Sequence, residues 1–86
     1  MASYSLFIKP SAAKEIEALP KKDRLKIILR IQGLALDPRP SGCEKLSGND
    51  KYRVRQGLYR ILYTINDNEV IVSVVKVGHR REVYRQ

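Results

Sequence analysis

Three strand-like segments follow one another in the second half of the chain, and this order constrains the fold more than any other feature. The segments cover residues 51–56, 59–65 and 69–77, and they are separated only by the turns Gln56-Gly57-Leu58 and Asn66-Asp67-Asn68. Turns this short join antiparallel neighbours, because parallel strands need a crossover connection of about a dozen residues or more. The sequence therefore predicts an antiparallel meander. Its last strand is rich in Val and Ile, as expected for a strand covered on most of its length.

The first half of the chain predicts one strand and two helices. Residues 3–8 alternate as a strand does, and Pro10 ends them. Ser11 is suited to cap a short helix over residues 12–19, and Pro20 suits the first turn of a second helix over residues 21–36. The second helix carries apolar residues at helical spacing, interrupted only by Gln32, and we expect this stripe to face the sheet: Leu25, Ile28, Leu29, Ala35 and Leu36. Residues 37–50 are rich in Pro, Gly, Ser and Asn and predict a loop around Leu46.

These elements predict a single α+β domain over residues 1–86. The N-terminal strand and the meander form a small antiparallel sheet, and the helical hairpin covers one of its faces. The composition is 43% apolar, which supplies one core without disulfide or metal support. A single cysteine, Cys43, cannot form an internal disulfide, and no Cys/His cluster has the spacing of a metal site. No stretch resembles a signal peptide or is long enough to span a membrane, so we expect a cytoplasmic protein with no membrane partner.

The net charge of +8 is concentrated in the second half of the chain. Residues 1–50 carry nine Lys or Arg against six Asp or Glu, whereas residues 51–86 carry eight against three. We therefore expect an anionic partner to bind the second half, with nucleic acid the leading candidate. An anionic membrane fits less well, because the basic residues follow strand-like rather than amphipathic helical patterns.

Arginine alternates with apolar residues in Tyr52-Arg53-Val54-Arg55, and this spacing places Arg53 and Arg55 on one face of a strand. No acidic residue lies between Lys51 and Arg60. A row of planar guanidinium groups is suited to binding phosphate, and we expect Arg60 to join it. Two structural alternatives remain: the row is a solvated strand face, or Arg60 pairs with Glu82 or Asp50.

Several motifs together carry a family resemblance over the whole chain. They are Leu19-Pro20, Asp37-Pro38-Arg39-Pro40, Lys45-Leu46-Ser47-Gly48, Tyr52-Arg53-Val54-Arg55, Tyr59-Arg60-Ile61-Leu62-Tyr63 and Val77-Gly78-His79-Arg80-Arg81-Glu82-Val83-Tyr84. Because it carries these motifs in this order, the chain resembles the RelE/ParE superfamily of toxins from toxin–antitoxin pairs, and the RelE-type ribonucleases in particular.

The resemblance implies an mRNA-cleaving endoribonuclease that acts in the ribosomal A site without a metal or other cofactor. The 2′-hydroxyl attacks the adjacent phosphate and leaves a 2′,3′-cyclic phosphate. The residues that match the family's catalytic positions are Arg53, Arg55, Arg60, Arg80 and Tyr84. We also expect the neighbouring basic residues Lys51, Arg81 and Arg85 to bind RNA.

The resemblance leaves the general base open. Some relatives have lysine where this chain has arginine, and arginine effectively cannot lose its proton. The proton of the 2′-hydroxyl is then accepted by Tyr84, by His79, or by a group of the ribosome or solvent. Arginines around Tyr84 would lower the pKa of its phenol, although that ring could equally stack on a base.

Two other functions remain open from the sequence. One is inhibition of DNA gyrase, as in the ParE branch, and the other is non-catalytic binding of nucleic acid. The family also implies a RelB-like antitoxin, acidic and partly disordered, that joins the toxin in a hetero-oligomer. We expect an antitoxin helix to dock beside the helical hairpin.

Overall fold

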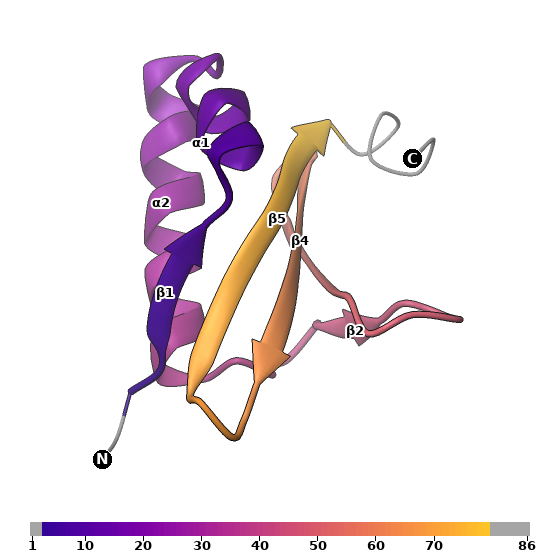
Figure 1. Ribbon diagram of the computed structural model, residues 1–86. Helices are drawn as coiled ribbons and strands as arrows, with labels where there is room; N and C mark the ends of the chain where they lie inside the picture. Colours follow the sequence, from indigo (N-terminus) through magenta and orange to yellow (C-terminus); the bar gives the residue numbers. More distant parts are fainter. Residues whose placement is uncertain (1–2, 80–86) are drawn as a thin grey trace.

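Two helices cover one face of a five-stranded sheet in the computed structural model, which describes residues 3–79 (Figure 1). The helices are α1 (Pro10–Glu17) and α2 (Lys21–Leu36). The strands are β1 (Ser5–Ile8), β2 (Glu44–Lys45), β3 (Tyr52–Gln56), β4 (Tyr59–Asn66) and β5 (Ile71–His79), in the sheet order β1-β5-β4-β3-β2. The predicted α+β class is confirmed, as is the position of the helical hairpin on one face.

The predicted meander is present. β3 pairs antiparallel with β4, and β4 pairs antiparallel with β5, with a register shift between Leu62 and Tyr63. The strand ends lie within two residues of the predicted ones. Gly57, in the turn between β3 and β4, has φ +61°, a conformation that glycine adopts without the steric cost paid by other residues.

The N-terminal strand was predicted to be antiparallel, and this is wrong. β1 runs parallel to β5, with Ser5 opposite Ile71 and Ile8 opposite Val74. In Figure 1 the arrows of β1 and β5 point the same way. The sequence pattern does not encode this direction, because side chains alternate between the two faces in both kinds of ladder.

The predicted loop over residues 37–50 contains a short strand that the sequence analysis missed. β2 pairs antiparallel with β3, with Glu44 opposite Arg53 and Lys45 opposite Tyr52. The Leu46 N–H donates to the Lys51 carbonyl at 2.8 Å and closes the connecting turn. A β2–β3 hairpin therefore extends the sheet on the side far from β1.

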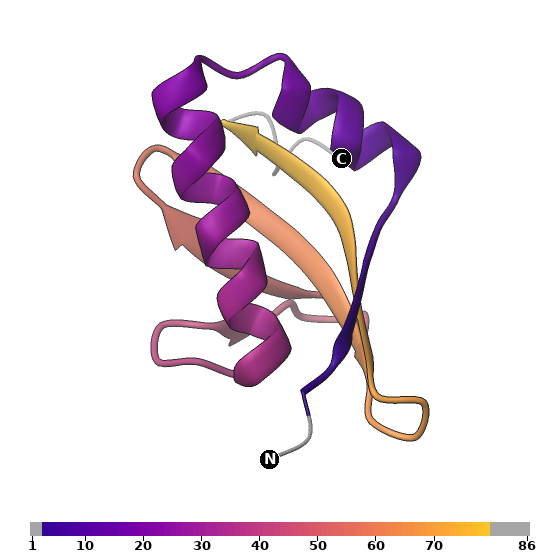
Figure 2. The same ribbon diagram turned by 90° about the vertical axis from the view of Figure 1, so that its left-hand side faces the viewer.

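The predicted apolar face of α2 is wrong in part, although Ile28 does pack against the core. The residues of α2 that are buried against the sheet are Ile27, Ile31 and Leu34, whereas Leu25, Leu29 and Leu36 are 53%, 67% and 79% exposed. The helix carries two apolar stripes, and both satisfy the helical period, so spacing alone could not decide which of them packs. Figure 2 shows the length of α2 lying across the sheet.

The helix starts differ slightly from the predictions. α1 begins at Pro10 with Lys9 at the N-cap, so Ser11 is not the cap. Proline is well tolerated there, because the first N–H groups of a helix have no partner within the helix. α2 has the predicted bounds, but Pro20 is its N-cap residue rather than part of its first turn.

The core lies between the helices and the inner face of the sheet. Its members are fully or almost fully buried: Ala12, Ile16, Ile27, Ile31, Leu34, Val54, Ile61, Tyr63, Val72, Val74 and Val77. No helix within residues 3–79 has the length and apolar character needed to cross a membrane.

Glu15 on α1 completes the edge of β5 where β1 ends. The last backbone bond between these segments joins the Lys9 N–H to the Val74 carbonyl at 2.9 Å. Beyond it, the Val77 N–H donates to Glu15 Oε1 at 3.0 Å, and Lys76 Nζ donates to Oε2 at 2.7 Å. A side-chain carboxylate thus replaces the missing strand.

Candidate functional site

Three arginines gather on the face of the sheet opposite the helices, and we call Arg53, Arg55 and Arg60 the arginine cluster. The neighbouring residues Val54 and Ile61 point into the core, so alternation turns the arginines to the other face. Arg55 on β3 lies directly opposite Arg60 on β4, and Arg53 lies opposite Leu62. The predicted alternation is therefore realised, and two neighbouring strands supply the cluster.

The side chains of the arginine cluster are less exposed to solvent than the sequence suggested. Arg55 is exposed, but Arg53 and Arg60 are only 8% and 7% exposed. Two guanidinium groups on neighbouring strands place several N–H donors and positive charge on one face of the sheet. This arrangement suits the binding of a negatively charged ligand such as phosphate.

The cluster has an acidic partner that the sequence analysis missed. The side chain of Arg53 forms an ion pair with Glu44, with 2.6 Å between Nη2 and Oε2. The Glu44 side chain is 63% exposed, so it is accessible to a ligand. A sequence signal was available, because Ser47-Gly48-Asn49-Asp50 is rich in turn-forming residues and lies between two short strand-like segments.

His79 lies away from the arginine cluster. It is opposite Tyr59 across the ladder, on the face covered by the helices, and the two rings meet edge to face at 6.1 Å. The Tyr59 hydroxyl donates to Asp23 Oδ2 on α2 at 2.9 Å, and this hydrogen bond raises the pKa of Tyr59. Tyr52 and Tyr63 stack on the same face, with ring centroids 5.8 Å apart, and burial raises the pKa of Tyr63. Their strand positions point these groups away from the arginine face.

The remaining predicted site residues divide into two groups. Lys51 is exposed immediately before β3, and its backbone N–H donates to the Asn49 side chain at 2.8 Å. Alternation places Lys51 on the same face as Arg53, at the end of the row. The other predicted residues, together with Glu82, one of the two acids considered for Arg60, lie outside the described residues: Arg80, Arg81, Glu82, Tyr84 and Arg85.

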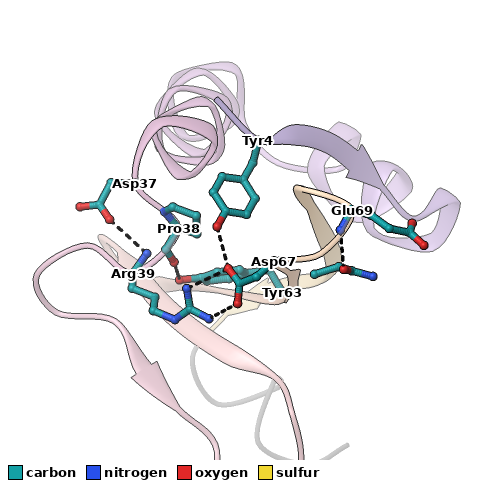
Figure 3. Close-up of polar contacts among 8 residues, drawn as sticks. Tyr4, Asp37, Pro38, Arg39, Tyr63, Asp67 and Glu69 are labelled. Atoms are coloured by element: carbon teal, nitrogen blue, oxygen red, sulfur yellow. Dashed lines mark hydrogen bonds and ion pairs between the residues drawn. The ribbon is translucent and has the colours of Figure 1, made fainter. Parts of the chain in front are cut away.

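A polar clamp holds the segment that leads into β2 (Figure 3). Arg39 forms two hydrogen bonds with Asp67 in the β4–β5 turn, at 2.9 and 3.3 Å, and the Tyr4 hydroxyl donates to the same carboxylate at 2.6 Å. The buried Tyr63 hydroxyl donates to the Pro38 carbonyl at 2.7 Å. The Arg39 guanidinium also lies 5.4 Å from the centre of the Tyr52 ring. These contacts fix residues 37–39, and so help to place Glu44 opposite Arg53.

The clamp predicts a pH-dependent contribution to stability. The Arg39 hydrogen bond, followed by that of Tyr4, lowers the pKa of Asp67 below its ordinary value of 3.8. A lowered folded-state pKa stabilises the fold above the unfolded-state value, and this stabilisation is lost as pH falls through the folded-state pKa. We expect Asp67→Asn to be less stable than the parent at neutral pH, and the difference to disappear in strong acid.

Denaturant unfolding of both proteins over a series of pH values measures this difference. Glu17→Gln, which changes an exposed carboxylate on α1, is the matched control. A gap between parent and Asp67→Asn that stayed constant from neutral to strongly acidic pH would contradict the ionic role of Asp67.

Sequence comparison places this chain among toxins. Residues 6–84 match the family model described as the ParE toxin of the type II toxin–antitoxin system parDE. The chain is 28% identical over 87 residues to the toxin RelG of Mycobacterium tuberculosis, and the match covers 96% of this chain and 98% of that protein.

Solved structures of similar shape agree with the sequence comparison. A mutant of the Escherichia coli toxin RelE with two arginines replaced by alanine, in its free state, has a TM-score of 0.78 and 30% identity, over 99% of this chain and 93% of that one. The archaeal RelE of a RelE–RelB complex from Pyrococcus horikoshii has a TM-score of 0.82 and 27% identity, over 91% of this chain and 96% of that one. The likeness covers nearly the whole length of each protein.

Proposed function

This chain belongs to the RelE/ParE superfamily and is the toxin of a type II toxin–antitoxin system, and from that premise we propose that it cleaves messenger RNA in the ribosomal A site. The observation that carries the proposal is the cross-strand pair of Arg55 and Arg60, with Arg53 on the same face. Guanidinium groups placed side by side on one face are suited to binding phosphate.

The chemistry we propose is transesterification within the RNA strand. The 2′-oxygen forms a bond to the adjacent phosphorus and the bond from phosphorus to the 5′-oxygen breaks, which gives a 2′,3′-cyclic phosphate and a free 5′-hydroxyl. Negative charge builds up on the phosphorane between these steps. Guanidinium groups held in place by two neighbouring strands would stabilise that charge without reorganising.

Glu44 supplies a proton acceptor that arginine cannot. Arg53 holds its carboxylate, and the Glu44 side chain is largely accessible. An ionised carboxylate within hydrogen-bonding reach of a 2′-hydroxyl acts as a general base. Glu44 therefore joins Tyr84 as a candidate for this role, whereas His79 lies on the opposite face of the sheet. Protonation of the leaving 5′-oxygen requires a second group.

Mapping of RNA ends tests the proposed function. The purified chain, added to a translating extract, is expected to cut mRNA within codons and to leave 2′,3′-cyclic phosphate ends. Intact mRNA with inhibited DNA supercoiling would instead favour a gyrase inhibitor. Intact mRNA with salt-dependent binding to nucleic acid would favour a non-catalytic binding module.

The exposed stripe of α2 is the surface we propose for the antitoxin. We call Leu25, Leu29 and Leu36 the leucine stripe; each is more than half exposed, and their spacing places them along one side of the helix. The chain carries a net charge of +8, which favours an acidic partner over a second copy of itself. An acidic amphipathic helix matches both the stripe and this charge.

Leu29→Asp is expected to weaken antitoxin binding by about tenfold or more, because it puts a charge at the centre of an apolar contact. Titration calorimetry with the cognate antitoxin measures the effect. Leu58→Asp is the control, because Leu58 is 60% exposed but lies in the β3–β4 turn. Equal binding by the parent and Leu29→Asp would exclude the leucine stripe from the contact.

A further inference from the structure

A pocket of about 220 Å³ lies at the tip of the β3–β4 hairpin, and the proposed cleavage chemistry does not use it. Its lining comes from the first turns of α2 and from the hairpin: Asp23, Lys26, Gln56, Gly57, Leu58 and Tyr59. Tyr59 points to the helix-covered face, so the pocket opens on the side opposite the arginine cluster. Its walls combine apolar surface with side chains of both charges.

The polar groups of the pocket are held in place but retain bonding capacity. Asp23 accepts the Tyr59 hydroxyl with Oδ2, and no hydrogen bond or ion pair within residues 3–79 occupies Oδ1. Over the same residues, the Lys26 ammonium and the Gln56 amide also have no side-chain partner. A ligand therefore meets a carboxylate acceptor, an ammonium donor and an amide in one small space.

This combination matches the Watson–Crick edge of guanine. Guanine presents two neighbouring donors, N1–H and the N2 amino group, beside the O6 acceptor. A carboxylate accepts from both donors, and an ammonium donates to O6. Adenine and cytosine place a ring-nitrogen lone pair beside their amino group, which would repel the carboxylate, and uracil offers a single donor. The Tyr59 ring and the Leu58 side chain supply surface for the flat base.

The pocket lies next to the arginine cluster along the ladder. Gln56 and Tyr59 are opposite each other, and the next pair is Arg55 and Arg60. Only the turn at Gly57 and Leu58 separates the two faces at this end of the sheet, and open space surrounds the position where a side chain would begin at Gly57. An RNA strand held by its phosphate on the arginine cluster can pass over this tip. We propose that the pocket binds a guanine base of the RNA strand held by the arginine cluster, an inference that rests on the ribonuclease function proposed above.

Titration with the four 5′-mononucleotides, followed by ¹H–¹⁵N NMR, tests the pocket. The phosphate is common to all four, so differences between them report the base. We expect 5′-GMP to shift the amide signals of Gln56, Gly57 and Leu58 and to bind about tenfold more tightly than 5′-AMP, 5′-CMP or 5′-UMP. Equal binding of the four nucleotides, or shifts confined to other residues, would overturn the proposal.

Two variants assign the selectivity to the pocket. Asp23→Asn can still accept the Tyr59 hydroxyl, and Lys26→Met retains most of the lysine stem, so both are expected to fold. Each should lose the preference for 5′-GMP, whereas the control Glu17→Gln should keep it. If both variants keep the preference for 5′-GMP, guanine binds at another site and the proposed pocket is wrong.

This titration is independent of cleavage, because a mononucleotide has no internucleotide bond. A chain that cuts mRNA but binds the four nucleotides equally overturns the guanine pocket alone. A chain that selects guanine but never cuts RNA overturns the ribonuclease function alone.

Discussion

Arg55→Gln is expected to lower the rate of RNA cleavage by about 100-fold or more, because it removes one preorganised donor from the charge that develops on phosphorus. Arg55 is the exposed member of the arginine cluster, so its replacement leaves no cavity in the protein. Because Arg55 is exposed, the same change should alter the free energy of unfolding by less than about 0.5 kcal/mol. Single-turnover cleavage and denaturant unfolding measure the two effects.

A large loss of cleavage with nearly unchanged stability distinguishes a functional arginine from a structural one. Lys14→Gln removes the same charge from an exposed position on α1 and is the matched control, for which we expect both quantities to stay close to the parent values. A folded Arg55→Gln protein with parental cleavage would remove Arg55 from the site. A marked loss of stability would show that Arg55 has a structural role instead.

Ile31→Ala is expected to lower the free energy of unfolding by about 2–5 kcal/mol, because it opens a cavity where α2 packs on the sheet. Ile31 is 2% exposed. The loss is large for a domain of this size, since small proteins are stable by only about 5–15 kcal/mol. Guanidinium unfolding followed by tyrosine fluorescence measures it, because the chain has no tryptophan.

Leu29→Ala is the matched control, two residues away on the same helix. Leu29 is mostly exposed, and we expect its replacement to change stability by less than about 0.5 kcal/mol. Equal losses of unfolding free energy from the two substitutions would contradict the orientation of α2 and would indicate that Leu29 is buried in the core.

The sequence predicted those parts of the fold that local pattern determines. Short turns determine that β3, β4 and β5 form a meander, and alternation places Arg53 and Arg55 on one face. Two features depended on contacts between distant segments and were not predicted. The sequence does not show that β1 pairs with β5, and so it does not show that the two strands run parallel. It also does not show which of the two apolar stripes of α2 packs on the sheet.

In the candidate site too, features set by local pattern were predicted, and features set by contacts between segments were not. Arg60 joins Arg53 and Arg55 because the β3–β4 turn sets the register, which is local information. Glu44 reaches Arg53 only through β2, a strand of two residues in a segment rich in turn-forming residues. His79 was considered for the site because it is a titratable side chain near the arginines in the sequence, but alternation along β5 turns its side chain to the helix-covered face.

Glu15 bears on the solubility of the toxin as well as on its fold. Unpaired N–H and C=O groups at a sheet edge are a template for strands of other chains, and such pairing starts aggregation. β5 extends past the end of β1, and there Glu15 already occupies the Val77 N–H and places a carboxylate at the edge. A strand of another molecule would have to displace that carboxylate before it could pair with β5. We therefore expect Glu15 to oppose self-association through this edge of the sheet.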